Sequence, residues 1–377
     1  MVDAAGLKSS WNVVAQYGDQ VPLYFYSTLF LTHPHTRELF PVSMSAQRDR
    51  LVSALGAIIS NVDDLDRLAP FLHQLGRDHR KFAVVAEHYP AVGSALLATL
   101  EHFSGPEWNE ELASEWEAAY GMVAKVMIES ADSASVETPP WWEAEVVGHE
   151  RRTVDVAVLT LTPNYALPYQ AGQSLALETP LRPRLWRYYS PATLPAADGS
   201  FELHVRLVGG GPVSTALVHS TRRGDVLRLG SPVGRQLTLD AAGPGDLVLL
   251  AGGTGLAPMK AIIEQIQLEG GNRRVHLFWG TRYHRELYDL SAMRALAQQH
   301  DWLHLVPCVS HENPFGGHVE AGSVVEVALR SATWPDHEIF VCGSPEMVRG
   351  TVTVLRNAGT PFDRVHVEEF GSEETLA

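Results

Sequence analysis

The stretch LVLLAGGTGLAPMKAII, residues 247–263, combines an apolar strand, a glycine-rich turn and the start of a helix. Its glycines Gly252, Gly253 and Gly255 allow a tight turn and the close approach of a phosphate group to the backbone. Pro258 suits the first turn of a helix, where a missing N–H group breaks no hydrogen bond. No Gly-Lys-Ser/Thr ends the turn, so it is not a P-loop. The stretch predicts a strand–turn–helix unit, either phosphate-binding or plain.

The residues that follow continue this alternation of strands and helices. Apolar, strand-like runs occur in VHLFWG, in WLHLVPCV and at the start of FVCGSPEMV, which spans residues 340–348. A helical pattern occupies residues 290–299, and another begins near Pro345. Strands that alternate with helices predict a parallel sheet. We therefore assign residues 241–377 to an α/β nucleotide-binding domain.

The sequence before residue 241 has a period of two instead. Residues 154–158 carry valine at every second position, and similar runs follow at 201–207 and 226–229. Short alternating runs separated by glycine and proline are typical of a small antiparallel barrel or sandwich. We assign this second domain to residues 142–240.

Residues 1–131 show the spacing of helices. Apolar residues recur at intervals of three and four in segments such as 51–62 and 112–127. The small, polar stretch SADSASVETPP follows and ends in two prolines, which favours a linker over residues 132–141. The sequence therefore predicts a multidomain protein: an all-α domain, an antiparallel β-barrel and an α/β domain with a parallel sheet.

The composition limits the compartment and the partners. The chain has 44 acidic and 29 basic residues and a net charge of −15, which argues against a nucleic-acid partner. Its two cysteines, Cys308 and Cys342, are too few for a disulfide framework. We see no signal-peptide pattern and no apolar window long enough to span a membrane. These features favour a cytoplasmic protein without a stable membrane anchor.

His79 is the candidate metal ligand of the helical domain. It follows Leu68, Leu72 and Leu75 at spacings of four, three and four, so it lies on the apolar face of its helix. A histidine in this place is either a core residue bonded to a carbonyl group or a ligand with one ring nitrogen free.

Two more polar residues are expected to face the same interior. Tyr26 lies within the apolar run YFYSTLF, and Gln47 lies four residues before Leu51 on the inward face of its helix. A tyrosine, a glutamine and a histidine on three helices can surround one flat ligand. The histidine would bind iron on one side, and the other two would donate hydrogen bonds to a gas.

Residues 1–131 resemble the globin domain of the flavohaemoglobins. The matching segments are YFYSTLF, RELFP, AQRDRLVSALGAI, DHRKF, EHYPAVGSALLATL and WEAAYG. The resemblance implies a haem b group with His79 as its proximal ligand. It also places at the haem Tyr26 and Gln47 as the distal pair, Phe40 and Leu51 as pocket residues, and Tyr89 beside the proximal histidine.

The chain departs from this family at two positions. Asp78 stands where the family usually has a lysine before the proximal histidine. Ala131 stands where the family has a glutamate that completes a network with the tyrosine and the histidine, and Glu129 and Asp132 are its acidic neighbours. These differences leave open whether the reaction is that of the family.

The remaining domains resemble the flavin and pyridine-nucleotide domains of ferredoxin-reductase-like proteins. The resemblance rests on RYYS, GGGPVST, the GxGxxP turn and FVCGSPEMV. The residues it places at FAD are Arg187, Tyr189, Ser190, Gly211, Val213, Ser214 and Phe370. Those it places at NAD(P)H are Gly253, Thr254, Gly255, Pro258, Cys342 and Gly343. Arg282 and Arg285 either hold a 2′-phosphate or are solvated surface residues, so NADH and NADPH both stay open.

The resemblance covers nearly the whole chain and implies a nitric oxide dioxygenase. Electrons would pass from NAD(P)H through FAD to the haem iron, where bound O₂ oxidises nitric oxide to nitrate. Two other functions stay open: an oxygen-binding or gas-sensing globin, and a haem-coupled flavin oxidoreductase with another electron donor or acceptor. We expect a monomer whose partners are the small substrates O₂ and nitric oxide.

Overall fold

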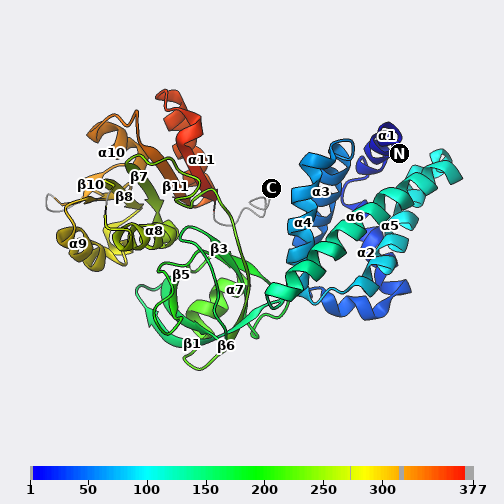
Figure 1. Cartoon of the computed structure of the whole chain (residues 1–377), viewed down its shortest axis with the longest axis horizontal. Helices are drawn as coiled ribbons and strands as arrows, with labels where there is room; N and C mark the ends of the chain where they lie inside the picture. The colour runs from blue at the N-terminus through cyan, green and yellow to red at the C-terminus, as the bar shows by residue number, and fades with distance from the viewer. Residues whose placement is uncertain (1–2, 272, 314–317, 370–377) are drawn as a thin grey trace. The chain divides into compact units, whose positions relative to one another are not determined.

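The computed structural model divides the chain into two compact units, which comprise residues 1–141 and 142–375. It describes residues 3–271, 273–313 and 318–369. Figure 1 shows a unit built of helices and a unit built around two sheets. Among the described residues, no helix has both the length and the apolar character needed to cross a membrane.

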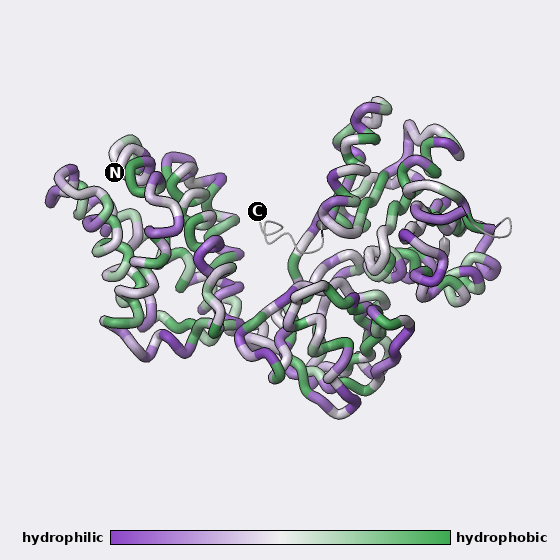
Figure 2. The backbone as a smooth tube through the Cα atoms, turned by 180° about the vertical axis from the view of Figure 1, so that it is seen from behind, coloured by the Kyte–Doolittle hydropathy of each residue, from purple (hydrophilic) through white to green (hydrophobic). Residues whose placement is uncertain are grey.

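The first unit is a bundle of α-helices joined by short 3₁₀ turns. Its helices are α1 (Ala4–Ala15), α2 (Gln20–Thr32), α3 (Ser45–Ser60), α4 (Leu65–His79), α5 (Tyr89–Ser104) and α6 (Glu110–Glu137). Side chains cap several of them: Asp64 accepts the N–H of Arg67 at the start of α4, and Asn109 accepts the N–H of Leu112 at the start of α6. The tubes of these helices alternate between hydrophobic and hydrophilic segments in Figure 2, as expected for helices with one buried face.

A glycine brings α4 close to α6. A Cβ atom on Gly76 would overlap the backbone of Met127, so only glycine allows this approach. His79 ends α4 three residues later. The close approach of the two helices therefore fixes where the end of α4, with its histidine, lies in the bundle.

Helix α6 extends into the segment that the sequence favours as a linker. It continues to Glu137 and ends before Pro139 and Pro140. Small residues such as alanine are good helix formers, whereas proline cannot continue a helix. The polar composition of SADSASVE therefore marks a solvated end of a helix.

The second unit begins with an antiparallel sheet, as predicted. Its strands are β1 (Trp142–Arg151), β2 (Val156–Pro163), β3 (Ser174–Glu178), β4 (Arg187–Tyr189), β5 (Phe201–Arg206) and β6 (Val226–Val233), in the order β4-β3-β6-β1-β2-β5. An isolated bridge between Pro191 and Leu203 joins the end of β4 to β5, so the two edges of the sheet meet. Helix α7 (Pro212–Thr215) and a π-helical turn, Ala216–Ser220, follow β5.

The rest of this unit is the predicted α/β domain with a parallel sheet. The strands are β7 (Leu247–Gly252), β8 (Val275–Thr281), β9 (Leu303–Val309), β10 (Glu320–Ala321), β11 (Glu338–Gly343) and β12 (Val365–Glu369). The helices are α8 (Leu256–Leu268), α9 (Leu290–Gln299), α10 (Val324–Ser331) and α11 (Pro345–Asn357).

In the strand order β10-β9-β8-β7-β11-β12, the chain adds strands on one side of β7 up to β10 and then continues on the other side of β7 with β11 and β12. The switch point of the sheet therefore lies between β7 and β11. Ligands of open α/β sheets bind at such a switch point, beyond the carboxyl ends of the strands. The turns after β7 and after β11 lie at this place. The topology therefore brings together the two turns that the sequence singles out.

Candidate functional site

The ring of His79 is held by its own helix. Its Nδ1 lies 2.7 Å from the carbonyl oxygen of Leu75. Because a carbonyl oxygen only accepts, Nδ1 carries the proton and Nε2 keeps a free lone pair. Burial lowers the pKa of His79, which favours the neutral ring. A neutral imidazole with a fixed tautomer is the form that binds a metal ion.

An ion pair lies beside this histidine. The carboxylate of Asp78 lies 3.7 Å from Nζ of Lys81, and the two side chains are 9% and 6% exposed. The amide of Gln74 also donates to Asp78, at 3.3 Å. The chain therefore has an aspartate before the histidine, with a lysine paired to it one turn later.

Tyr26 and Gln47 come together from α2 and α3. The hydroxyl of Tyr26, whose residue is 5% exposed, lies 3.3 Å from the backbone carbonyl oxygen of Gln47. This separation is long for an O–H···O hydrogen bond, so the bond is weak. Burial raises the pKa of Tyr26 to about 12, and the hydroxyl therefore keeps its proton at neutral pH.

Aromatic and aliphatic side chains surround this pair. The rings of Tyr26 and Phe40 are 5.4 Å apart and lie edge to face, and Phe30 contacts both. Leu51 and Leu55 pack on the same core from α3 and are only partly buried. Apolar side chains that the protein covers incompletely fit a flat, apolar ligand such as haem, whose iron needs one histidine ligand.

Tyr89 begins α5 and lies near an acidic residue of α6. Burial raises its pKa to about 12, and the negative charge of Asp132 adds to the rise. Ala131 has no carboxylate, so Asp132 supplies the negative charge near this tyrosine. In the described part of the chain, no hydrogen bond joins His79 to Tyr89, Tyr26 or Gln47.

A buried cluster joins the barrel to the last described strand. The hydroxyl groups of Ser190 and Ser174 are 3.0 Å apart, and Ser174 donates to Oε1 of Glu368 at 2.5 Å. Burial raises the pKa of Glu368 to about 7, against the hydrogen bonds of both serines. Its other oxygen, Oε2, is buried with no hydrogen-bond partner among the described residues. An unpaired buried acceptor fits a site that a bound group completes.

Arg187 and Tyr189 lie on β4, which pairs with β3. Nη1 of Arg187 donates to the carbonyl oxygen of Trp186 at 2.8 Å. Burial raises the pKa of the Tyr189 hydroxyl. Ser190 follows directly on the strand, so the RYYS residues share one edge of the barrel with Ser174. Phe370 lies outside the described residues.

The glycine-rich segment before α7 forms a tight, open turn. Gly210 has a φ of +75°, and a Cβ atom on it would meet nothing within 4 Å. Ser214 fastens the turn: its hydroxyl accepts the N–H of Val208 at 3.1 Å and donates to the carbonyl of Gly211 at 3.2 Å. Val213 is buried. The turn leaves room beside the first N–H groups of the helix, as a phosphate requires.

The two turns that the sequence predicts to bind the nucleotide meet at the ends of β7 and β11. A Cβ atom on Gly343 would lie 3.3 Å from Cα of Gly252, and one on Gly255 would overlap the carbonyl of Cys342. Gly253 has a φ of +55°. Thr254 is buried in the 3₁₀ turn Gly253–Gly255, and Pro258 is buried in the first turn of α8. The thiol of Cys342 is buried in the core and its pKa is raised, so only the backbone of this residue borders the turn.

The structure adds residues that sequence reasoning missed. Ser174 and Glu368 complete the cluster at Ser190, and Glu368 stands only two positions before Phe370. Arg206 of β5 lies over the nucleotide turn, with Nη1 3.1 Å from where a Cβ atom of Gly253 would be. Asp155 and Glu286 hold its guanidinium at 3.1 and 3.5 Å. The only signal in the sequence was the place of Arg206 just before the glycine cluster.

The two arginines considered for a 2′-phosphate are exposed after β8. Arg282 lies 3.7 Å from Glu286, and the guanidinium of Arg285 lies 4.5 Å from the ring centroid of Tyr283. Neither contact selects between NADH and NADPH.

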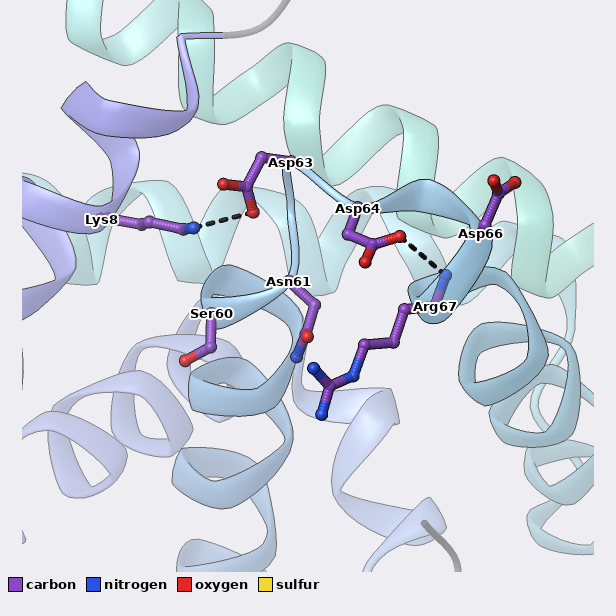
Figure 3. Close-up of a pocket in the computed structure, with 7 residues that line it drawn as sticks. All are labelled: Lys8, Ser60, Asn61, Asp63, Asp64, Asp66 and Arg67. Atoms are coloured by element: carbon purple, nitrogen blue, oxygen red, sulfur yellow. Dashed lines mark hydrogen bonds and ion pairs between the residues drawn. The ribbon is translucent and has the colours of Figure 1, made fainter.

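A surface pocket of the helical unit contains none of the predicted residues. Its lining comes from α1, from the end of α3, from the first turn of α4 and from the segment between α3 and α4, as Figure 3 shows. Lys8 pairs with Asp63 at 2.7 Å, and Asp64 caps α4. Within the described ranges, no group of three or more His, Cys, Asp or Glu side chains is arranged to hold a metal ion. The polar groups of the pocket thus serve the local fold.

Comparisons with known proteins match the three domains one by one. The globin family matches residues 23–127, the oxidoreductase FAD-binding domain matches 143–237, and the oxidoreductase NAD-binding domain matches 249–353. The chain is 25% identical to a flavohemoprotein of Bacillus subtilis, with 98% of this chain and 97% of the relative covered. It is 27% identical to a flavohemoprotein of Chromobacterium violaceum, with 97% and 96% covered.

A solved structure has the same fold over the whole length. The flavohemoglobin from Malassezia yamatoensis, with bound FAD and haem, superimposes with a TM-score of 0.77 at 18% identity and covers 98% of each chain. The chain therefore consists of a globin domain followed by FAD-binding and NAD-binding oxidoreductase domains, and over nearly its whole length it is similar to proteins named flavohemoprotein.

Proposed function

We propose that this protein is a flavohemoprotein and acts as a nitric oxide dioxygenase driven by NAD(P)H. The observation that carries the proposal is the combination, in one chain, of a globin histidine with a free Nε2, a protonated tyrosine in an apolar pocket and a reductase unit. A gas store or a gas sensor needs no rapid supply of electrons, so the attached reductase favours an enzyme.

When bound, the nicotinamide nucleotide would supply two electrons, the flavin would allow them to be passed on singly, and the haem iron would use them with O₂. His79 would hold the iron through Nε2. The carbonyl of Leu75 keeps the proton on Nδ1 and fixes the plane of the ring. Tyr89 and Asp132 provide a hydroxyl and a negative charge on α5 and α6.

Tyr26 and Gln47 would orient the gas. A hydroxyl with a pKa of about 12 is a donor at neutral pH, and its bond to the carbonyl of Gln47 is weak. It can therefore give up that bond for a stronger one to a polarised ligand. Phe40 and Leu51 keep water away from the pocket, which strengthens the hydrogen bond.

In the reductase unit, Ser190, Ser174 and Glu368 would border the flavin. Because the pKa of Glu368 is about 7, its carboxyl group can take up or release a proton near neutral pH. Arg187, Tyr189 and the turn at Gly211 would hold the FAD. The turns around Gly253 and Gly343 would hold the nucleotide, with the cation of Arg206 near its phosphates.

The test follows absorption spectra and products of the purified protein. With NAD(P)H, O₂ and nitric oxide, we expect nitrate at about two molecules per NAD(P)H, because each nitrate needs one external electron. Haem reduction without consumption of nitric oxide would instead favour another acceptor, in line with the altered residues Asp78 and Ala131. Binding of O₂ without haem reduction by NAD(P)H would favour a gas-binding globin.

The assignment of His79 as the haem ligand can be tested with a control histidine in the same helix. His79→Ala should lose haem and keep FAD, because the two sites lie in different units. His73→Ala is the matched change, since His73 bonds to Ser130 instead. Equal haem content in the His79 variant and the wild type would contradict the assignment.

A further inference from the structure

Polar and charged side chains link the antiparallel barrel to the nucleotide domain within the second unit. Nζ of Lys260 lies 2.7 Å from Asp289 and 3.9 Å from Glu202. Nε2 of His204 lies 3.7 Å from the same carboxylate of Glu202, and Nδ1 of His204 lies 2.7 Å from the hydroxyl of Tyr288. Glu202 and His204 belong to β5, whereas the other three belong to the nucleotide domain.

Two members of this contact between the barrel and the nucleotide domain are buried, so their hydrogen bonds contribute to its stability. The side chains of His204 and Asp289 are 1% and 2% exposed. Arg152 approaches Asp289 to 3.7 Å, which gives that carboxylate a second cation. A buried polar group that loses its partner costs more free energy than an exposed one. Removing one member should therefore disturb the contact between the two domains.

The tautomer of His204 follows from its neighbours. Burial raises the pKa of Tyr288 and lowers that of His204, so both groups are neutral. The carboxylate of Glu202 faces Nε2, and a negative charge favours the proton on the nitrogen that it faces. Nδ1 is then the acceptor, and the hydroxyl of Tyr288 donates to it across the domain contact.

Tyr288 connects this bond to the nucleotide turn. Its ring lies edge to face on Trp279, with centroids 5.4 Å apart. The indole N–H of Trp279 donates to the carbonyl oxygen of Gly253 at 2.9 Å. An unbroken series of contacts thus runs from strand β5 of the barrel to the glycine turn between β7 and α8.

We propose that His204 and Tyr288 are positioning residues: their hydrogen bond holds the turn around Gly253 in register with the barrel and so sets the geometry in which the nucleotide meets the flavin. This inference rests on the proposed function only in that it concerns flavin reduction by NAD(P)H. We assign neither residue a contact with the nucleotide or the flavin. Both act through Trp279 and the glycine turn.

The test uses two disrupting variants, one conservative variant and two controls in the full-length protein loaded with haem and FAD. Tyr288→Phe removes the donor and keeps the ring on Trp279. His204→Leu removes the acceptor, and His204→Asn restores an acceptor at the place of Nδ1. Tyr165→Phe and His318→Leu are the matched controls, because both side chains are exposed.

Two readouts separate positioning from mere stability. In anaerobic stopped-flow mixing, we expect the limiting rate of flavin reduction to fall about tenfold in both disrupting variants, while nucleotide affinity changes by less than about threefold. Hydrogen–deuterium exchange should rise in the peptide that covers residues 247–259 and stay unchanged in the helical unit. His204→Asn should recover at least half of the rate, and both controls should match the wild type.

Several results would overturn the proposal. Limiting rates within about twofold of wild type and unchanged exchange at the turn would show that the bond positions nothing. A slow His204→Asn variant with lost FAD and a lowered melting temperature would show a structural role alone. If NAD(P)H fails to reduce the wild-type flavin, the proposed function fails, and the exchange of the turn still decides this inference by itself.

Discussion

At the scale of single residues, the hydroxyl of Tyr26 has two possible partners. In the structure it meets the carbonyl of Gln47 at 3.3 Å, and a bound gas would compete for it. A hydrogen bond to a strongly polarised acceptor is worth about 1.5–3 kcal/mol, which is roughly a 10- to 100-fold change in rate. Because the bond to Gln47 must be given up, we expect the lower end of this range.

Tyr26→Phe should therefore release O₂ about tenfold faster and consume nitric oxide more slowly at low oxygen. Haem content, FAD content and haem reduction should stay unchanged. Stopped-flow measurement of oxygen dissociation checks this. Tyr24→Phe in the same helix is the control, since that ring stacks on His102. A dissociation rate within about twofold of wild type would show that Tyr26 serves only the core.

The raised pKa of Glu368 predicts that the free energy of unfolding depends on pH. Its pKa is raised from 4.5 to about 7 by burial, so the folded protein binds the proton more tightly than the unfolded chain does. The stabilisation is complete below the unfolded pKa and is lost as the pH rises through the folded pKa. It amounts to at most about 3 kcal/mol.

Glu368→Gln should abolish this dependence, because an amide does not titrate in this range. We expect the free energy of unfolding of the wild-type reductase unit to fall between about pH 5 and 8, and that of the variant to stay flatter. Denaturant unfolding followed by flavin fluorescence gives both curves. Parallel curves for the two proteins would show that another group titrates.

At the scale of elements, the packing of α4 on α6 depends on Gly76. A Cβ atom there would overlap the backbone of Met127, and a backbone cannot move aside as a flexible side chain can. Gly76→Ala should destabilise the helical unit by about 2 kcal/mol or more. It should also weaken haem retention, because α4 ends in His79.

Gly121→Ala is the matched control on α6. A Cβ atom at Gly121 meets nothing within 4 Å, so alanine should stabilise the helix by up to about 1 kcal/mol. Thermal unfolding followed by circular dichroism compares the two variants. Equal melting temperatures of the Gly76→Ala and Gly121→Ala variants would contradict the prediction, because they would show that α4 and α6 can move apart without loss of stability.

Sequence patterns predicted the elements because each pattern is local. The spacing of Leu68, Leu72 and Leu75 placed His79 on a buried face, and the glycine turn at residues 252–255 predicted the nucleotide end of the parallel sheet. Contacts between distant residues have no such local signal. Ser174 and Glu368 are 194 positions apart, and no periodicity pairs them.

The same reason explains the other omissions. The sequence places His204 only within the strand-like run 201–207. Its partner Tyr288 lies in another domain, so no local pattern points to their hydrogen bond. The proximity of Asp132 to Tyr89 depends on how α6 packs, which no pattern within α6 reveals. The polar linker pattern also failed to exclude a helix that continues to Glu137.

At the scale of the whole molecule, the chain joins two units that each fold around their own core. In the proposed function, the reductase unit and its electron acceptor belong to one chain and cannot diffuse apart. Two sites joined in one chain meet at an effective concentration of the order of millimolar, whereas separate units meet at the concentration used in the assay. The covalent link should therefore speed electron transfer without any new contact.

Separate proteins of residues 1–141 and 142–377 test this. We expect the first to bind haem and the second to bind FAD and to be reduced by NAD(P)H. Mixed at micromolar concentration, they should consume nitric oxide roughly 100- to 1,000-fold more slowly than the intact chain, and the rate should rise in proportion to the reductase concentration. A mixture as fast as the intact chain would mean that the units bind each other tightly. A mixture whose rate does not depend on reductase concentration would place the limiting step within one unit.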